Sequence, residues 1–173
     1  MQKFCCCTGH RPQKFPFEYG GRNQEFQTYL KELESKIKAA ITEHGVTCFI
    51  SGMALGVDLD FAEIVLKLRK KYSLKLECAI PCPNQTMKWD KNEIARYNRV
   101  LKKADSITLV SERYTHECML KRNRYMVDKS NLVIAVFNGI EKGGTWYTIQ
   151  YAERRSVPIM ILNLKNKNTG DKI

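Results

Sequence analysis

The sequence predicts an α/β fold, because short apolar runs alternate along the chain with longer segments of helical periodicity. The runs are mostly apolar on both faces, which is typical of parallel strands covered by helices on both sides. The alternation extends through the 173 residues with no internal repeat and no linker. It indicates a doubly wound, Rossmann-like sheet, mostly parallel, of about six strands with right-handed crossovers and helices on both faces.

Apolar runs of strand length occur at six places. They are Phe4–Cys7, Val46–Ile50, Leu74–Ile80, Ser106–Val110, Leu132–Phe137 and Pro158–Leu162. Their order in the sheet does not follow from the sequence. The length suits one hydrophobic core, so we expect a single domain over residues 1–163. The polar residues 164–173 are expected to form a flexible tail.

Amphipathic segments lie between these runs. The predicted helices are Asn23–His44, Asp58–Tyr72, Thr86–Lys103, Glu117–Ser130 and Thr145–Arg155. Gly45 follows the first of them, as glycine commonly does at a helix end. The third is expected to bury a stripe that includes Met87 and Leu101.

The composition is that of a basic globular protein. There are 29 Lys and Arg against 18 Asp and Glu, a net charge of +11. This charge favours an anionic partner without choosing between nucleic acid, nucleotide and mere solubility. No apolar run of about 18 residues occurs, and the first residues lack the apolar core of a signal peptide. We therefore expect a cytoplasmic protein with no membrane partner.

The seven cysteines are expected to be free and buried. Their odd number and the lack of a secretion signal argue against a disulfide framework. Most lie in apolar runs, where cysteine packs as a small apolar side chain. A zinc site would have to combine Cys78, Cys82, His116 and Cys118, but no CxxC or HxxxH spacing supports it. No metal is expected.

Glycine, hydroxyl and charged residues gather after the predicted strands. In open α/β sheets ligands bind at the carboxyl ends of the strands, so these loops predict a ligand site. The loops are Thr8-Gly9-His10-Arg11-Pro12, Ser51-Gly52-Met53-Ala54-Leu55-Gly56-Val57-Asp58, Pro81-Cys82-Pro83-Asn84-Gln85, Ser111-Glu112-Arg113-Tyr114, and Asn138-Gly139 followed by Gly143-Gly144-Thr145.

Two of these loops are suited to phosphate. Ser51-Gly52 with Gly56, and Gly143-Gly144-Thr145, each precede a helix whose free N–H groups and dipole attract anions. Neither matches the P-loop or the GxGxxG pattern, so an ordinary NAD site is not supported. Together they predict a phosphate-bearing ligand.

Single side chains near these loops admit a structural and a functional interpretation. Asp58 is either an acid in a first helical turn or a carboxylate that binds ribose hydroxyls. Trp89 is either a core residue or a wall on which a base stacks. Arg11 can bind a phosphate bidentately. Arg122 and Asp128 are six residues apart and point in different directions on a helix, so one local pair does not explain both.

Four motifs in order resemble the YpsA-like branch of the SLOG superfamily: TGHRP, SGMALGVD, RNRYMVD and GGT. This superfamily groups Rossmann-like domains related to the Smf/DprA DNA-processing proteins and to the LOG phosphoribohydrolases. The similarity covers residues 3–162. It implies binding of nucleotides or nucleotide-derived signals of the ADP-ribose type. The matching positions are Thr8, Gly9, Arg11, Ser51, Gly52, Asp58, Arg122, Asn123, Asp128, Gly143, Gly144 and Thr145.

One position departs from the LOG enzymes. They carry a catalytic glutamate three residues after the threonine of their glycine-rich loop, where this chain has Thr148. A hydroxyl cannot supply the acid–base or charge-stabilising work of a carboxylate. The resemblance therefore implies a binding protein more than an enzyme of this kind.

The resulting hypothesis is binding of a nucleotide-derived small molecule, either ADP-ribose-like or a cyclic nucleotide signal. The protein would sense or sequester it, the latter as phage anti-defence if the gene is phage-encoded. No cofactor is required, and a homo-oligomer is expected because closed symmetric assemblies are common. Two alternatives stay open: a nucleosidase or LOG-type phosphoribohydrolase that uses Asp58 or Asp128, and a DprA-like single-strand DNA binder that uses Tyr72, Tyr114 and Tyr125. The predicted ligand-binding residues are Thr8, Gly9, His10, Arg11, Ser51, Gly52, Met53, Asp58, Gln85, Trp89, Arg113, Tyr114, Arg122, Asn123, Asp128, Asn138, Gly143, Gly144 and Thr145.

Overall fold

The computed structural model describes residues 2–164, which form one six-stranded sheet in the order β4-β3-β2-β1-β5-β6. Every neighbouring pair of strands is parallel. The predicted α/β, Rossmann-like fold is therefore confirmed. The strands are β1 (Phe4–Thr8), β2 (Cys48–Ser51), β3 (Lys75–Ile80), β4 (Ser106–Leu109), β5 (Leu132–Phe137) and β6 (Ile159–Asn163).

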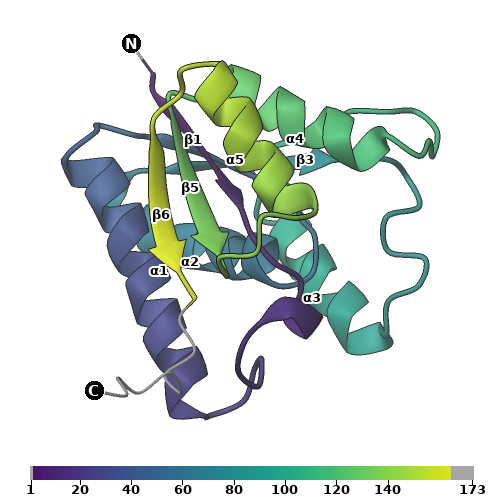
Figure 1. Ribbon diagram of the computed structural model, residues 1–173, viewed down its shortest axis with the longest axis horizontal. Helices are drawn as coiled ribbons and strands as arrows, with labels where there is room; N and C mark the ends of the chain where they lie inside the picture. The colour runs from purple at the N-terminus through teal and green to yellow at the C-terminus, as the bar shows by residue number, and fades with distance from the viewer. Residues whose placement is uncertain (1, 165–173) are drawn as a thin grey trace.

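Helices cover both faces of the sheet (Figure 1). One layer contains α1 (Gln24–Thr42), α2 (Val57–Tyr72) and α3 (Lys91–Leu101), and α2 contacts both of its neighbours. The other layer contains α4 (Cys118–Lys129) and α5 (Gly144–Arg154), which contact each other. A short 3-10 turn, η1 (Pro12–Lys14), follows β1. Right-handed crossovers require this division, since the chain moves one way from β1 to β4 and the other way from β5 to β6.

The third helix begins later than the sequence predicts. Residues 83–88 form turns, and α3 starts after Asp90, which accepts hydrogen bonds from the backbone of Asn92 and Glu93. The Glu93 side chain accepts from the Asp90 backbone in return, which completes a capping box. Met87 is consequently 74% exposed and not part of a buried stripe.

The edge strands are less covered than expected. All six residues of β5 are buried, which fits its place next to β1 in the middle of the sheet. In β4, by contrast, Ile107 and Leu109 are about half exposed, at 55% and 49%. The prediction of burial on both faces is therefore wrong for β4, because the apolar pattern does not show which strand ends at an edge.

The seven cysteines are all free and buried, as predicted. Within residues 2–164, no three His, Cys, Asp or Glu side chains gather as a metal site would require. No described helix is long and apolar enough to cross a membrane. Leu164, predicted to begin a flexible tail, is buried and donates its N–H to the carbonyl of Phe137 at 2.8 Å. Residues 165–173 of that tail lie outside the described part of the chain.

The strand order creates a reversal beside β1. From β1 the chain proceeds through β2 and β3 to β4, and α4 then carries it back to β5 on the other side of β1. The loops that follow β1 and β5 therefore diverge to opposite faces, which opens a crevice at the carboxyl ends of these two strands. Figure 1 shows β1, β5 and β6 pointing toward this end, where η1 and the loop before α5 lie.

Candidate functional site

A cavity of about 210 Å³ lies in this crevice, and we call it the inner cavity. Its walls come from the β1–η1 loop, the start of α2, one side of α4 and the start of α5. The lining residues are Cys7, Thr8, Gly9, His10, Arg11, Lys14, Ala54, Asp58, Met119, Arg122, Asn123, Met126, Gly144 and Thr145. Nine of them are among the predicted ligand-binding residues.

The start of α5 forms one wall. Gly143 precedes it with φ 85°, a left-handed conformation that favours glycine, and no side chain caps the helix. The first N–H groups of a helix have no partner within it and carry the positive end of the dipole. Gly144 and Thr145 present this end to the inner cavity. The wall can therefore accept an anion.

Two cations of the η1 turn face the same space. Arg11 and Lys14 line the inner cavity, and neither forms a salt bridge with any residue that the structure describes. The Lys14 ammonium lies beside the turn before α5, since a Cβ added to Gly143 would meet Lys14 Nζ at 3.3 Å. Lys14 is thus adjacent to the positive end of α5, and Arg11 lines the same cavity.

Arg122 supplies a third cation, from the buried side of α4. It is 5% exposed, and Nη1 donates to the carbonyl of Gly52 and lies 3.3 Å from Asp58 Oδ2. Burial lowers the pKa of Arg122 and raises the pKa of Asp58, so the attraction between them does not offset their desolvation. Within the described structure, Arg122 Nε is buried without a hydrogen-bond partner.

Arg122 also occupies the place where the sequence predicts a phosphate. A Cβ at Gly52 would overlap its guanidinium group, so glycine is required there for the arginine to approach. Ser51 Oγ donates to the carbonyl of Asp58 at 2.7 Å, and the N–H of Val57, at the start of α2, donates to the carbonyl of His10. Groups of the protein itself therefore occupy the space beside the Ser51–Gly56 loop where a phosphate was predicted. The loop before α5 is the one that remains accessible to a ligand.

His10 is buried between the two crevice loops. Its Nε2 accepts the N–H of Asn138 at 3.1 Å, and Nδ1 lies 3.5 Å from Thr145 Oγ1. Burial lowers the pKa of His10 to about 4, and the Lys14 charge adds to this effect. The imidazole is therefore neutral at pH 7 with its proton on Nδ1, so it contributes shape and polarity to the cavity but no charge.

Asp60 anchors the segment of chain that follows Arg11 and Lys14. This buried carboxylate accepts hydrogen bonds from Tyr19 Oη at 2.7 Å, Tyr29 Oη at 2.9 Å and Arg96 Nη2 at 2.6 Å. Tyr19 follows η1 in the chain, so the network ties this loop to α1, α2 and α3. This buried network therefore anchors the segment that follows the η1 turn.

A second cavity of about 1260 Å³ adjoins the first and is called the outer chamber. His10 and Lys14 line both. Its remaining lining residues are Gln13, Phe15, Pro16, Phe137, Asn138, Gly139, Ile140, Lys142, Gly143, Asn163 and Leu164. The predicted residues Asn138 and Gly143 lie here and not in the inner cavity.

Four predicted residues lie beneath the crevice and four lie away from it. Ser51 and Gly52 support Arg122 and Asp58, while Met53 is fully buried in the core with φ 59°. Gln85 Nε2 donates to the carbonyl of Gly52, and its Oε1 is buried with no partner among the described residues.

The other four are not brought into the crevice. Trp89 packs edge-on against Tyr97 at 5.5 Å and against the core, which is the structural interpretation. Arg113 and Tyr114 are exposed in the loop after β4. Asp128 is exposed on α4 and pairs with Tyr151 and Arg155, pointing away from Arg122 as the six-residue spacing predicts.

Sequence reasoning missed Lys14 and Lys142. Lys14 ends the η1 turn three residues after Arg11, and Lys142 directly precedes Gly143. Both lysines could have been found from the sequence by their position, since they lie in or next to the loops that follow β1 and β5. Thr148, at the position of the LOG glutamate, is fully buried and donates to the carbonyl of Gly144 at 2.8 Å while accepting from Asn123.

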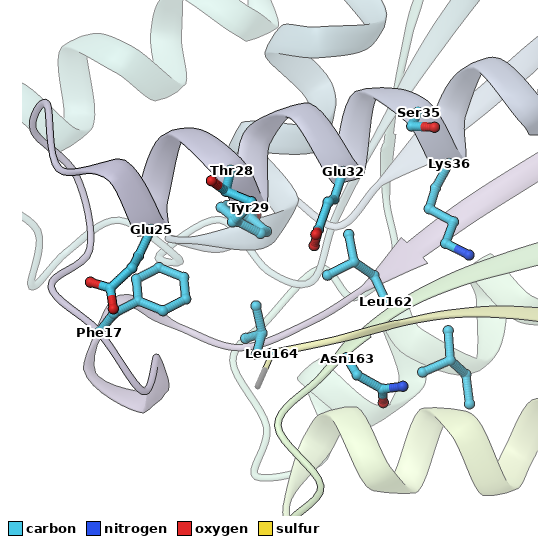
Figure 2. Close-up of a pocket in the computed structure, with 11 residues that line it drawn as sticks. Phe17, Glu25, Thr28, Tyr29, Glu32, Ser35, Lys36, Leu162, Asn163 and Leu164 are labelled. Atoms are coloured by element: carbon cyan, nitrogen blue, oxygen red, sulfur yellow. The ribbon is translucent and has the colours of Figure 1, made fainter. Parts of the chain in front are cut away.

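Another groove lies outside the crevice, between α1 and β6 (Figure 2). Its volume is about 460 Å³, and its polar lining includes Glu25, Glu32 and Lys36. Two carboxylates against one ammonium disfavour an anion there. The crevice is therefore the candidate functional site.

The family is decided by comparison with known sequences. The sequence pattern of the YspA SLOG family matches residues 5–166. The chain belongs to the YspA SLOG family. Three of the four motifs that gave the resemblance lie in loops that line the crevice or support it, and the fourth, RNRYMVD, lies on α4.

Two similar proteins come from Bacillus species. A UPF0398 protein of Bacillus pumilus is 30% identical over 169 residues, which cover 94% of this chain and 88% of that protein. The SPbeta prophage-derived protein YoqJ of Bacillus subtilis is 32% identical over 136 residues, covering 71% of this chain and 79% of YoqJ.

One solved structure shows that the SLOG fold is shared more widely. DNA processing protein A (DprA) from Streptococcus pneumoniae superimposes with a TM-score of 0.60, at 16% identity. The match covers 92% of this chain and 50% of DprA, so the chain spans half the length of that protein. At this identity the similarity concerns the fold alone.

Proposed function

We propose that the protein binds a phosphate-bearing, nucleotide-derived small molecule in the crevice between β1 and β5. The observation that carries the proposal is the charge of the inner cavity. Arg11, Lys14 and Arg122 meet there against one carboxylate, Asp58, beside the uncapped start of α5. A phosphate has several anionic oxygens, so it can accept hydrogen bonds from a helix start and from arginine at once while its charge is attracted by both.

The buried pair of Arg122 and Asp58 supports a binding role. Burial shifts the pKa of each group toward its neutral form, so holding the pair in the crevice costs desolvation energy. Groups perturbed in this way within a cleft are candidates for ligand contact. The unpartnered Arg122 Nε is a donor that a ligand oxygen can satisfy, and Asp58 can accept a ribose hydroxyl.

We propose that the bound molecule is held and not cleaved. Thr148 stands where the resemblance to LOG enzymes implies a carboxylate, and its hydroxyl is already used by Gly144 and Asn123. Retention without turnover suits a cytoplasmic sensor or a protein that sequesters a signal. The prophage origin of the relative YoqJ favours sequestration of a nucleotide signal in phage–host conflict.

Calorimetric titration tests the proposal. The panel is ADP-ribose, its cyclic isomers, NAD and cyclic dinucleotides, with single-stranded DNA as the competing class. At least one small molecule is expected to bind, and Arg11→Ala is expected to weaken it about 10- to 100-fold, since a charge-assisted hydrogen bond contributes about 1.5–3 kcal/mol. Arg99→Ala, on the exposed side of α3, is the matched control. Binding of DNA alone, or equal affinity in the Arg11 variant, would reject the proposal.

Chromatography of the same mixtures tests retention. The ligand should be recovered intact after long incubation at saturating protein. Release of a free base at a rate proportional to protein concentration would show that the site is catalytic.

A further inference from the structure

The size of the inner cavity limits what it can contain. Its 210 Å³ is below the range of about 300–1000 Å³ in which whole small-molecule ligands bind. It has room for a phosphate and part of a sugar. A nucleotide-derived ligand must therefore extend out of this cavity.

The outer chamber is the direct continuation. His10 and Lys14 line both spaces, and Gly143 and Gly144 lie on either side of the boundary. Lys14 Nζ is adjacent to Gly143, so one ammonium can contact groups in both cavities. A single ligand passing Lys14 would occupy the inner cavity and the chamber together.

The chemistry of the chamber suits an anionic or hydroxyl-rich group and not a cation. Lys14 and Lys142 are its charged lining residues, and none of the described lining residues is an aspartate or glutamate. Its 1260 Å³ exceeds what one further phosphate would need.

Hydrogen bonds hold the wall of the chamber in a defined conformation. The Asn138 side chain fixes it by donating to the carbonyl of Lys14 at 3.2 Å and accepting from the N–H of Ile140 at 3.1 Å. Gly139 has φ 84°, a left-handed conformation that the tight turn after β5 requires. The apolar part of the wall includes Phe15 and Phe137, where the flat face of a sugar or base can pack.

We propose that the outer chamber binds a second moiety, joined through phosphate to the part of the ligand in the inner cavity. The ligand class is then a nucleoside diphosphate that carries a further sugar, and mononucleotides bind only in part. This inference rests on the proposed function, because it assumes that a phosphate occupies the inner cavity. It adds Lys142 as a residue that determines ligand length.

Matched pairs of ligands test the inference by calorimetry. The pairs are AMP with ADP-ribose, UMP with UDP-glucose and GMP with GDP-mannose, which differ by the added phosphate and sugar. In at least one pair the longer molecule is expected to bind at least about tenfold more tightly, the gain from one good additional contact. Lys142→Glu is expected to reduce this preference at least about fivefold, because a carboxylate in the chamber repels the second phosphate.

Controls separate this inference from the function it rests on. Lys70→Glu makes the same charge change on the last turn of α2, far from the chamber, and should leave the preference unchanged. Equal affinities within every pair, together with no effect of Lys142→Glu, would overturn the inference and leave phosphate binding intact. If no member of any pair binds, the proposed function fails and the inference with it.

Discussion

Replacement of Arg122 by methionine tests whether the crevice is built on a buried ion pair. Asp58 is 6% exposed, and without Arg122 the backbone N–H of Ala54, at 3.2 Å, remains as its hydrogen-bond donor in the described structure. Removing one partner of a buried pair typically costs about 3–5 kcal/mol. For a chain of this length each kcal/mol lowers the melting temperature by about 2–4 °C. The expected loss is therefore about 6–20 °C, measured by circular dichroism.

The pH dependence of that loss identifies its cause. Desolvation already raises the pKa of Asp58, and removal of the Arg122 charge raises it further. The folded variant then binds the Asp58 proton more tightly than the unfolded chain, so its stability falls as pH rises through the folded pKa. Urea unfolding should show that the deficit relative to the parent shrinks below this pKa, by up to about 1.4 kcal/mol per pH unit.

A matched substitution on the same helix provides the control. Arg124 is exposed on α4 and donates to Tyr147 Oη, so Arg124→Met should change stability little at any pH. If Arg122→Met were as mild as Arg124→Met, or if its deficit did not change with pH, the account of a desolvated pair would be refuted.

Three further predictions follow from the same contacts. Asp60→Asn should lower the unfolding free energy by about 3 kcal/mol in urea titrations, because three side chains donate to this buried carboxylate; a loss below about 1 kcal/mol would contradict its supporting role. Gly52→Ala should destabilise by about 1–3 kcal/mol by displacing Arg122, while Gly144→Ala, with no atom within 4 Å of its added Cβ, should change stability little in the same assay. His10, whose pKa is about 4, should show no NMR titration between about pH 6 and 8. Its contribution to stability should be lost as the pH falls from the pKa of histidine in the unfolded chain, about 6.5, toward 4. An NMR titration midpoint near 6.5 would contradict the burial of His10.

The sequence allowed the layers of the fold to be predicted but not the edges of the sheet. A run such as Leu132–Phe137 is apolar on both faces because it is buried on both, and the prediction is confirmed. The run Ser106–Val110 was expected to be covered in the same way, although polar Ser106 and Thr108 alternate in it with apolar residues, and it forms the edge strand β4. Which strand lies at the edge of the sheet depends on pairing between strands that are far apart in the sequence. The apolar pattern of one run indicates only the local preference for a strand.

The candidate site was predictable as loops and not as individual contacts. Glycine and hydroxyl residues after the strands of a parallel sheet indicate the crevice, and nine of the nineteen predicted residues line its inner cavity, with Asn138 and Gly143 in the outer chamber. The contact of Arg122 with Gly52 joins residues 70 positions apart, and the spacing of residues along a helix or strand cannot predict such a contact. Lys14 was overlooked because lysine is common on surfaces, and only its position beside Gly143 distinguishes it.

A crystal structure with ADP-ribose or a UDP-sugar bound tests the central claim most directly. The account predicts a phosphate within hydrogen-bond distance of the N–H groups of Gly144 and Thr145, with Arg11 on the same phosphate and the second sugar directed toward Lys142. Electron density for the phosphate at any other place, such as the groove between α1 and β6, would contradict it.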